Sequence, residues 1–203
     1  MPQPVIGLTG PMCAGKNQAQ TILARYGFAV LDTDETAHEA LECVRDRVIE
    51  EFSAVALEKG IQLTNSDGSI DRRALGAVVF SNPELLARHE EIIYPKINEL
   101  INQFIEENKD SGVVINAPLL YKSPVLQRCT FVIFVSAPVV LRFIRAIRRD
   151  SLPIMQIFRR FIAQKHLFAQ YIGKNVDIKR VDNRGSIRAF ERKLAKLLSY
   201  KGY

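Results

Sequence analysis

The sequence predicts an α/β fold, with a mainly parallel sheet that helices cover on both faces. Short apolar runs typical of buried strands alternate with amphipathic helical segments along its 203 residues. A glycine loop, Gly10-x4-Gly15-Lys16, joins the first of these runs to a helix. The apolar content of 47% is sufficient for one globular unit with a substantial core.

The composition also limits the class of protein. No apolar run reaches the length of a membrane-spanning helix, and the N-terminus lacks the basic flank of a leader peptide, so we expect a soluble cytoplasmic protein without a membrane partner. Its three cysteines, Cys13, Cys43 and Cys129, are far apart and form no CxxC pattern. This usage fits a reduced compartment. We expect a monomer or a weak homo-oligomer.

The N-terminal part predicts a strand, a loop and a helix. "PVIGL" has the character of a buried strand, and the helix after the glycine loop extends from about Lys16 to Tyr26, where Gly27 closes it. "FAVLDTD" is the next predicted strand, with Asp32 and Asp34 at its carboxyl end. Parallel sheets place their ligands at this end of the strands.

About seventy-five residues without a convincing strand follow. In "DGSIDRRALGAVVF" a helix is predicted to begin at Asp71, and a longer helix follows with Ser81 or Asn82 as its cap and Pro83 in its first turn. Apolar residues recur at helical spacing in this longer segment. We interpret the region as a helical insertion between two strands.

The C-terminal half returns to alternating elements. "GVVINAPLL" and "CTFVIFV" predict buried strands, and residues 136–150 and 152–171 predict two basic helices with a break at Ser151 to Pro153. A last strand is predicted near "VDIKRVDN", and Ser186 is expected to cap a final amphipathic helix.

The positive charge is concentrated in one segment. The chain has a formal net charge of +6, and seven basic residues against one acid between positions 142 and 166 account for it. Such a local excess suits a highly anionic ligand or nucleic acid, although a solvated helix face remains an alternative. We expect no nucleic-acid partner, because the segment lacks interleaved exposed aromatic residues and a recognition motif.

The glycine loop has the chemistry of a phosphate site. Glycine at positions 10 and 15 lets the backbone curl so that its amides point at phosphate oxygens, Lys16 adds a charge, and the helix start adds its positive dipole end. Asn17 occupies the position where the strict motif has a magnesium-binding Ser or Thr. A plain glycine turn is the alternative interpretation.

Several motifs together resemble one family over nearly the whole chain. They are "IGLTG" with Gly15-Lys16, "LDTDETAHE", "DGSIDRRALGAVVFSNPELLARHEEIIYPKI", "APLLY", "RAIRRDSL", "RFIAQ" and "VDNRGS". The chain resembles the dephospho-coenzyme A kinase family, which phosphorylates the ribose 3′-hydroxyl of dephospho-coenzyme A with ATP. The resemblance implies a P-loop kinase core (about 1–35, 111–138 and 174–203), a helical acceptor-binding insertion (about 36–110) and a basic lid (about 139–173). It also implies Mg²⁺ as cofactor.

The chain also departs from the family pattern. Asn17 replaces Ser or Thr, Pro11-Met12-Cys13 replaces a glycine-rich interior, Asn116 replaces Asp, Tyr94 stands in a usual His-Pro, and Lys122 replaces an acid. Two of these, Asn17 and Asn116, concern magnesium rather than the fold. A catalytically silent nucleotide binder, and a kinase of the same fold for another small nucleotide-like acceptor, therefore remain alternatives.

The resemblance assigns roles to individual residues. Asp34 is the candidate base, and the alternative is that Asp34 or Thr33 caps the helix that follows. Catalysis is assigned to Asp34, Lys16 and Arg149, ATP binding to Gly10, Pro11, Met12, Cys13, Ala14, Gly15, Lys16, Asn17, Arg145, Arg149 and Asn183, and acceptor binding to Asp32, Asp34, Arg72, Tyr94, Leu119 and Arg160. Asn17 is the expected metal ligand, weak and either direct or through a water.

Overall fold

The computed structural model describes residues 3–149 and 152–203. The strands are β1 (Val5–Thr9), β2 (Ala29–Asp32), β3 (Val113–Asn116), β4 (Phe131–Ser136) and β5 (Ile178–Asp182). The helices are α1 (Lys16–Arg25), α2 (Thr33–Cys43), α3 (Arg45–Glu58), α4 (Arg72–Val79), α5 (Pro83–Glu107), α6 (Val139–Arg149), α7 (Ile154–Ala163) and α8 (Ile187–Tyr200), with 3-10 helices η1 (Leu120–Lys122), η2 (Pro124–Arg128) and η3 (Phe168–Tyr171). They form two compact units, Met1–Asp32 with Ile105–Tyr203, and Thr33–Phe104.

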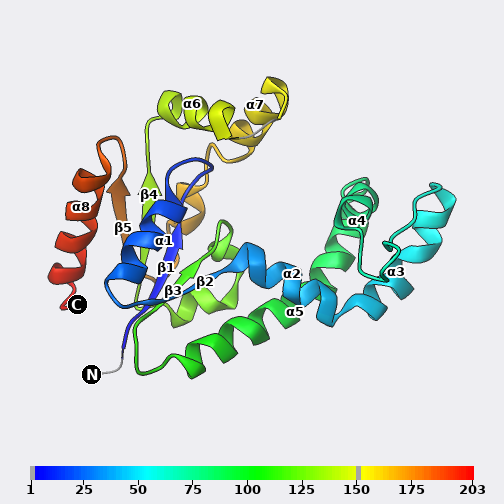
Figure 1. The fold of residues 1–203 in the computed structure, drawn as a ribbon, viewed down its shortest axis with the longest axis horizontal. Helices are drawn as coiled ribbons and strands as arrows, with labels where there is room; N and C mark the ends of the chain where they lie inside the picture. The colour runs from blue at the N-terminus through cyan, green and yellow to red at the C-terminus, as the bar shows by residue number, and fades with distance from the viewer. Residues whose placement is uncertain (1–2, 150–151) are drawn as a thin grey trace. The chain divides into compact units, whose positions relative to one another are not determined.

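The first unit contains a five-stranded parallel sheet in the order β2-β3-β1-β4-β5, which confirms the predicted α/β class (Figure 1). Strand β1 is central, and the chain passes from it to β2 on one side and reaches β4 on the other. The connections that leave β1 and β3 run in opposite directions along the sheet, and open α/β sheets bind their ligands at such a switch point. The glycine loop leaves β1 at this point.

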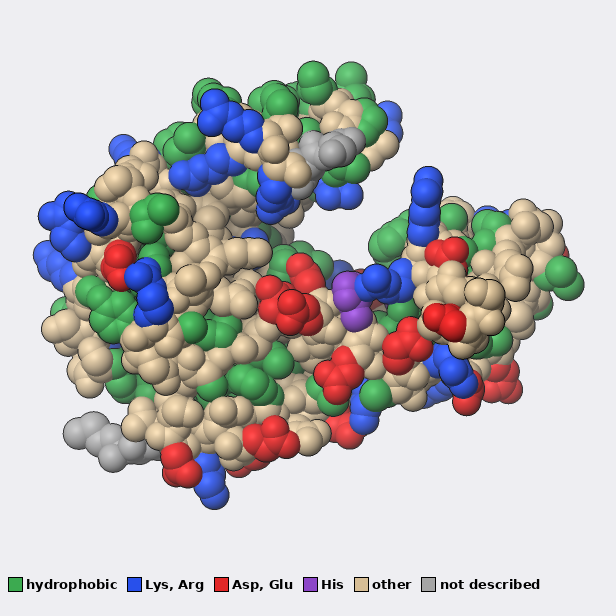
Figure 2. Space-filling model, in the orientation of Figure 1, with side chains coloured by type: hydrophobic (Ala, Val, Ile, Leu, Met, Phe, Trp, Pro, Cys, Tyr) green, Lys and Arg blue, Asp and Glu red, His purple; other side chains and the backbone are tan. Residues whose placement is uncertain are grey.

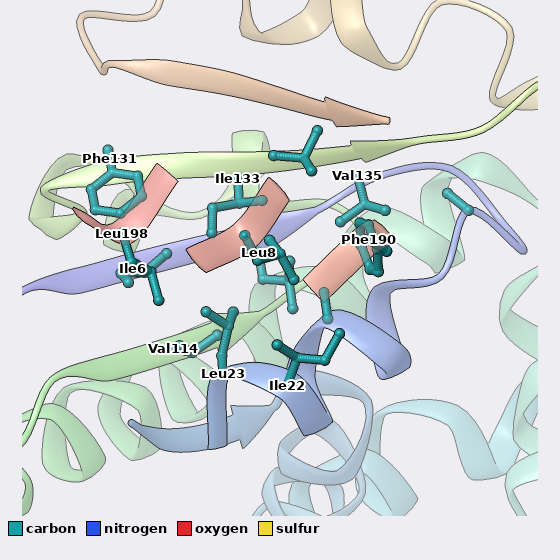
Figure 3. Close-up of a cluster of buried hydrophobic side chains, with 14 residues drawn as sticks. Ile6, Leu8, Ile22, Leu23, Val114, Phe131, Ile133, Val135, Phe190 and Leu198 are labelled. Atoms are coloured by element: carbon teal, nitrogen blue, oxygen red, sulfur yellow. The ribbon is translucent and has the colours of Figure 1, made fainter. Parts of the chain in front are cut away.

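One face of the sheet packs against α1 and α8. Side chains from β1, β3 and β4 meet the apolar stripes of these two helices, as Figure 3 shows for Ile6, Leu8 and Ile133 facing Ile22 and Phe190. Ser186 caps α8 as predicted, because its hydroxyl accepts a hydrogen bond from Ala189 N. This packing fixes the position of α1, the helix that follows the glycine loop.

Short 3-10 segments pack on the other face of the sheet. Leu120, Val125 and Leu126 are almost fully buried there, and Tyr171 packs edge-on to Phe134. Space is tight, since a Cβ on Gly7 of β1 would lie 3.0 Å from a Val132 methyl carbon.

The second unit contains α2 to α4 and most of α5 around its own apolar cluster, which includes Phe52, Leu75 and Val78; the helical insertion predicted for about 36–110 falls mainly in this part of the chain. Two predicted helix starts are confirmed. The Asp71 carboxylate accepts from the amides of Arg73 and Ala74, so Asp71 is the N-cap of α4. The Asn82 side chain accepts from Glu84 N at the start of α5, which resolves the choice between Ser81 and Asn82.

The predicted helix over 152–171 is wrong in length. Helix α7 ends at Ala163, and the chain continues into η3. The reason is tertiary: Tyr171 is buried and its hydroxyl lies 2.9 Å from Thr9 Oγ1 on β1, which draws this segment onto the sheet. The predicted break at Ser151 and the end of the preceding helix at Asp150 fall outside the described residues, whereas Pro153 is the N-cap of α7.

None of the helices in the described part of the chain combines the length and the hydrophobicity that crossing a membrane requires.

Candidate active site

The glycine loop joins β1 to the first turn of α1, as predicted. Gly10 and Gly15 have φ angles of 148° and 107°, which side-chain-bearing residues rarely adopt. Space excludes a side chain as well, because a Cβ on Gly10 would collide with the carbonyl oxygen of Val135 and one on Gly15 with the amide of Asn183. Cys13 also adopts the left-handed conformation, with a φ of 59°, which is uncommon for a residue that carries a side chain.

Side chains from distant elements hold the carbonyl groups of the loop. Arg142 Nε donates to Met12 O at 2.9 Å, Arg145 Nη1 donates to Cys13 O at 3.3 Å, and Asn183 Nδ2 donates to Ala14 O at 2.9 Å. In a planar trans peptide the N–H points opposite to the carbonyl of the preceding residue. Fixing these three carbonyls therefore also fixes the direction of the amides that follow them.

The amide groups of the loop have two further contacts. Met12 N donates to Gln164 Oε1 at 2.7 Å, and Ala14 N donates to Pro11 O at 3.1 Å. The ammonium group of Lys16 lies 3.0 Å from Gly10 O, to which it donates. These contacts hold the loop in a curled form just before the first turn of α1, a position in the chain that binds anions in many proteins.

This loop borders a cavity of about 390 Å³. Its described lining is Cys13, Gly15, Lys16, Asn17, Arg145, Arg148 and Arg149. Four of these side chains are cations and none is an acid, so the cavity favours a polyanion. The structure brings together the predicted residues Lys16, Asn17, Arg145 and Arg149, and it adds Arg148.

Arg142 has a different position from the arginines that line the cavity. It is 8% exposed, its guanidinium lies 4.6 Å from the centroid of the Phe161 ring, and burial lowers its pKa. Arginine nevertheless stays protonated in proteins. Arg142 therefore acts as a fixed cation that positions the phosphate loop.

Asn183, the predicted adenine contact, is 2% exposed, and its amide also donates to Gln18 Oε1 at 3.3 Å. Arg145 Nη2 donates to its backbone carbonyl at 3.2 Å. The side chain of Asn183 thus braces the loop, and its contact with adenine stays a prediction.

A polar network lies at the carboxyl ends of β2 and β3. Asn116 is 2% exposed and pairs in register with Asp32 on β2. Its Nδ2 donates to Gln20 Oε1 at 2.7 Å and to Asp32 Oδ2 at 3.1 Å. Because Asn116 is a donor in both bonds, an Asp at this position would face the Asp32 carboxylate directly.

These residues fit a magnesium ion with few protein ligands. The described residues contain no cluster of three His, Cys, Asp or Glu side chains able to hold a metal. Mg²⁺ often uses only one or two protein oxygens and completes its shell with phosphates and water. Asn17 lines the cavity, and Gln20 lies one turn further along α1 in contact with the Asn116 network. Asn17 is therefore a suitable oxygen donor, and Asp32 is linked to the same region of α1 through Asn116 and Gln20.

The remaining predicted residues lie elsewhere. Asp34 is exposed in the first turn of α2, and Arg160 is exposed on α7, outside the residues that line the cavity. Leu119 is 44% exposed just before η1. Tyr94, on α5, donates its hydroxyl to Glu90 Oε1 at 3.2 Å.

Arg72 lines a second cavity, of about 190 Å³, inside the helical unit, together with His38, His89 and apolar residues of α2, α4 and α5. Burial lowers the pKa of His89, which favours its neutral form. The polar groups that line this cavity are thus the guanidinium of Arg72 and the imidazoles of His38 and His89.

Comparison with known proteins identifies the family. A family model described as dephospho-CoA kinase matches residues 4–181. The chain belongs to the dephospho-CoA kinase family. The dephospho-CoA kinase of Treponema denticola is 39% identical over 98% of this chain and 91% of its own length, and that of Treponema pallidum is 36% identical over 98% and 96%.

Solved structures agree with this dephospho-CoA kinase fold. A crystal structure from Thermus thermophilus matches with a TM-score of 0.80 at 27% identity, covering 98% of this chain and 97% of its own. The dephospho-CoA kinase of Campylobacter jejuni matches with a TM-score of 0.65 at 23% identity, covering 98% and 97%. At that identity the second match supports the fold alone.

Sequence reasoning missed Arg142, Arg148, Gln164, Gln18 and Gln20. Arg148 had a signal, because it lies between Arg145 and Arg149 in the basic segment. Gln164 had none, since its contact with Met12 spans 152 positions of the chain.

Proposed function

We propose that this protein transfers the γ-phosphate of ATP to the ribose 3′-hydroxyl of dephospho-CoA, the final step of coenzyme A biosynthesis. The observation that carries the proposal is the cavity at the glycine loop, which four cations line in a chain of this family. The triphosphate of ATP carries the negative charge that complements these cations. The family to which the chain belongs indicates dephospho-CoA as the acceptor.

The cations act on the phosphates. Lys16 and the guanidinium groups of Arg145 and Arg149 stabilise the negative charge that redistributes over the phosphate oxygens during transfer. Arg142 and Asn183 act through the loop: they hold its carbonyls, so that the amides need no reorganisation when phosphate arrives. Asn17 would hold Mg²⁺, directly or through a water, and Asp32 would orient a water on it; the ion would supply charge neutralisation.

Asp34 is the proposed base that accepts the proton of the 3′-hydroxyl, since it follows the end of β2 by two residues. The alternative is a structural role: Asp34 lies in the first turn of α2, where a negative charge stabilises the helix through its dipole whether or not a substrate is bound. Arg72, Tyr94, Leu119 and Arg160 stay proposed acceptor contacts. The cytoplasmic location and the monomeric or weakly oligomeric state also stay predictions.

A steady-state assay with a panel of acceptors tests this proposal. With ATP and Mg²⁺, kcat/KM should be highest for dephospho-CoA, well above the values for adenosine, AMP and shikimate. A higher kcat/KM for another acceptor would support a kinase of the same fold with a different substrate. Tight ATP binding without transfer to any acceptor would support the silent nucleotide binder.

A Lys16→Met variant serves as the control for the site. It should lose ATP binding and turnover together, because Lys16 is a lining cation of the cavity. Lys59→Met is the matched surface control, since the Lys59 ammonium group donates to Ser81 Oγ within the helical unit and is not among the residues that line the cavity. It should leave both unchanged.

A further inference from the structure

Helices α6 and α7 expose an apolar surface to solvent. Eight large hydrophobic side chains, each 42–72% exposed, define what we call the outer face: Val139, Val140, Ile144 and Ile147 of α6, and Ile154, Met155, Phe158 and Ile162 of α7. Figure 2 shows hydrophobic side chains along the outer edge of this segment. Contiguous exposed apolar patches on a folded protein commonly mark an interaction site.

On α6, the outer face and the nucleotide cavity lie on different sides of the helix and meet at Arg148, which lines the cavity one turn after Ile144. On α6, positions 140, 144 and 147 share one side of the helix, whereas Arg142 bonds to the phosphate loop and Arg145 and Arg149 line the cavity from the other side. The two helices pack together through Phe143 and Phe161, whose ring centroids are 5.6 Å apart. Binding of ATP by the arginines therefore leaves the outer face exposed.

The surroundings of the outer face are cationic. Arg159 follows Phe158 on α7, and Lys165 comes two residues after the end of α7; both are exposed, and neither is among the residues that line the nucleotide cavity. Asp150 is the one acid in the sequence of residues 139–173, which also contains seven Arg and Lys residues. A second copy of the chain on this face would bring like charges together, whereas a partner with a negative surface would complement them.

We propose that the outer face binds the surface of a lipid bilayer that contains anionic headgroups. A helix with a wide apolar side and arginine or lysine beside it lies in the plane of such a surface, with its apolar side chains at the boundary of the acyl chains. Two adjacent helices of this kind double the buried apolar area. This peripheral attachment extends beyond phosphate transfer, and it departs from the sequence prediction of no membrane partner.

Cosedimentation with lipid vesicles tests the proposal on the full chain without substrates, so the outcome does not depend on the proposed enzyme activity. Binding should be strong on phosphatidylcholine vesicles that contain phosphatidylglycerol and weak on pure phosphatidylcholine. Arg159→Gln with Lys165→Gln should lower the anionic partition coefficient about 30-fold, since each basic residue near such a surface contributes about fivefold. High salt should weaken wild-type binding in the same direction.

A second double variant tests the apolar part. Ile144→Ser with Phe158→Ser should weaken vesicle binding about tenfold or more, because two of the exposed anchors are lost. Leu57→Ser is the matched control: Leu57 is 80% exposed on α3, in the other unit, and its replacement should change nothing. Circular dichroism and ATP affinity report whether each variant is folded.

Several results would overturn the proposal. They are no vesicle binding by the wild type, equal binding to neutral and anionic vesicles, or an unchanged partition coefficient in the Arg159/Lys165 variant, which leaves the apolar packing intact. Concentration-dependent dimerisation that the Ile144/Phe158 variant abolishes would assign the outer face to self-association instead.

Discussion

Replacing Asn116 by Asp tests the polar network at the end of β3. Asn116 is buried and its Nδ2 lies 3.1 Å from Asp32 Oδ2. The substitution exchanges this donor for a second carboxylate. Two charges about 4 Å apart repel by about 4 kcal/mol at the effective dielectric of protein sites, which corresponds to a rise of about 3 units in the pKa of the introduced carboxyl.

This shift predicts how the loss of stability depends on pH. An acid whose pKa is higher in the folded than in the unfolded protein destabilises the fold above its unfolded pKa, and the loss increases until pH passes the folded pKa. For Asn116→Asp the free energy of unfolding should fall by about 4 kcal/mol at pH 7.5 and by only about 1.5 kcal/mol at pH 5. Magnesium should restore part of the loss at pH 7.5, because it neutralises the pair.

Urea unfolding at the two pH values, with and without Mg²⁺, measures these differences. Asn82→Asp is the matched control, since Asn82 caps α5 and Asp is an equally good cap, so its stability should be unchanged. A loss below about 1 kcal/mol for Asn116→Asp, independent of pH and metal, would contradict the contact with Asp32 on which the reasoning depends.

Three further predictions concern turnover and reactivity. Asp34→Asn should lower kcat by about 10²–10⁴-fold and leave the Kd of ATP in calorimetry nearly unchanged; more than about a tenth of the wild-type rate would remove Asp34 from the mechanism. Asn17→Ser should lower the Mg²⁺ concentration for half-maximal activity by about 10–100-fold, whereas an unchanged titration would show that Asn17 is not a compromised ligand. ATP should slow the alkylation of Cys13, which lines the cavity, and equal rates of labelling with and without ATP would refute this.

The other two cysteines are internal controls for the alkylation. Cys43 is exposed in the helical unit, so ATP should not protect it. Cys129 is buried, and burial raises the pKa of its thiol to about 12, so it should react slowly in the folded protein.

The sequence predicted the parts of the fold that local patterns specify. The strand before Gly10, the glycine loop and the caps at Asp71 and Ser186 are all short-range features, because glycine conformation and capping depend on a few neighbouring residues. The parallel character of the sheet was predicted from the alternation of strands and helices, whereas the strand order came from the structure.

Contacts between distant segments were beyond local patterns. The helix predicted over 152–171 ends early because Tyr171 reaches Thr9, 162 positions away. The hydrogen bonds by which Arg142 and Gln164 hold the glycine loop likewise join residues that are far apart in the sequence. In the sequence Arg142 is one arginine among several, and only the packing of α6 and α7 separates it from the arginines that line the cavity.

The most direct test of the central claim is to identify the product by ³¹P NMR after incubation of the protein with ATP, Mg²⁺ and dephospho-CoA. Phosphate transfer predicts ADP and a new 3′-phosphomonoester resonance in equal amounts, with no change in the pyrophosphate of the acceptor. ADP with free inorganic phosphate, or unchanged ATP in the presence of saturating acceptor, would contradict the assignment of this chain as an active dephospho-CoA kinase.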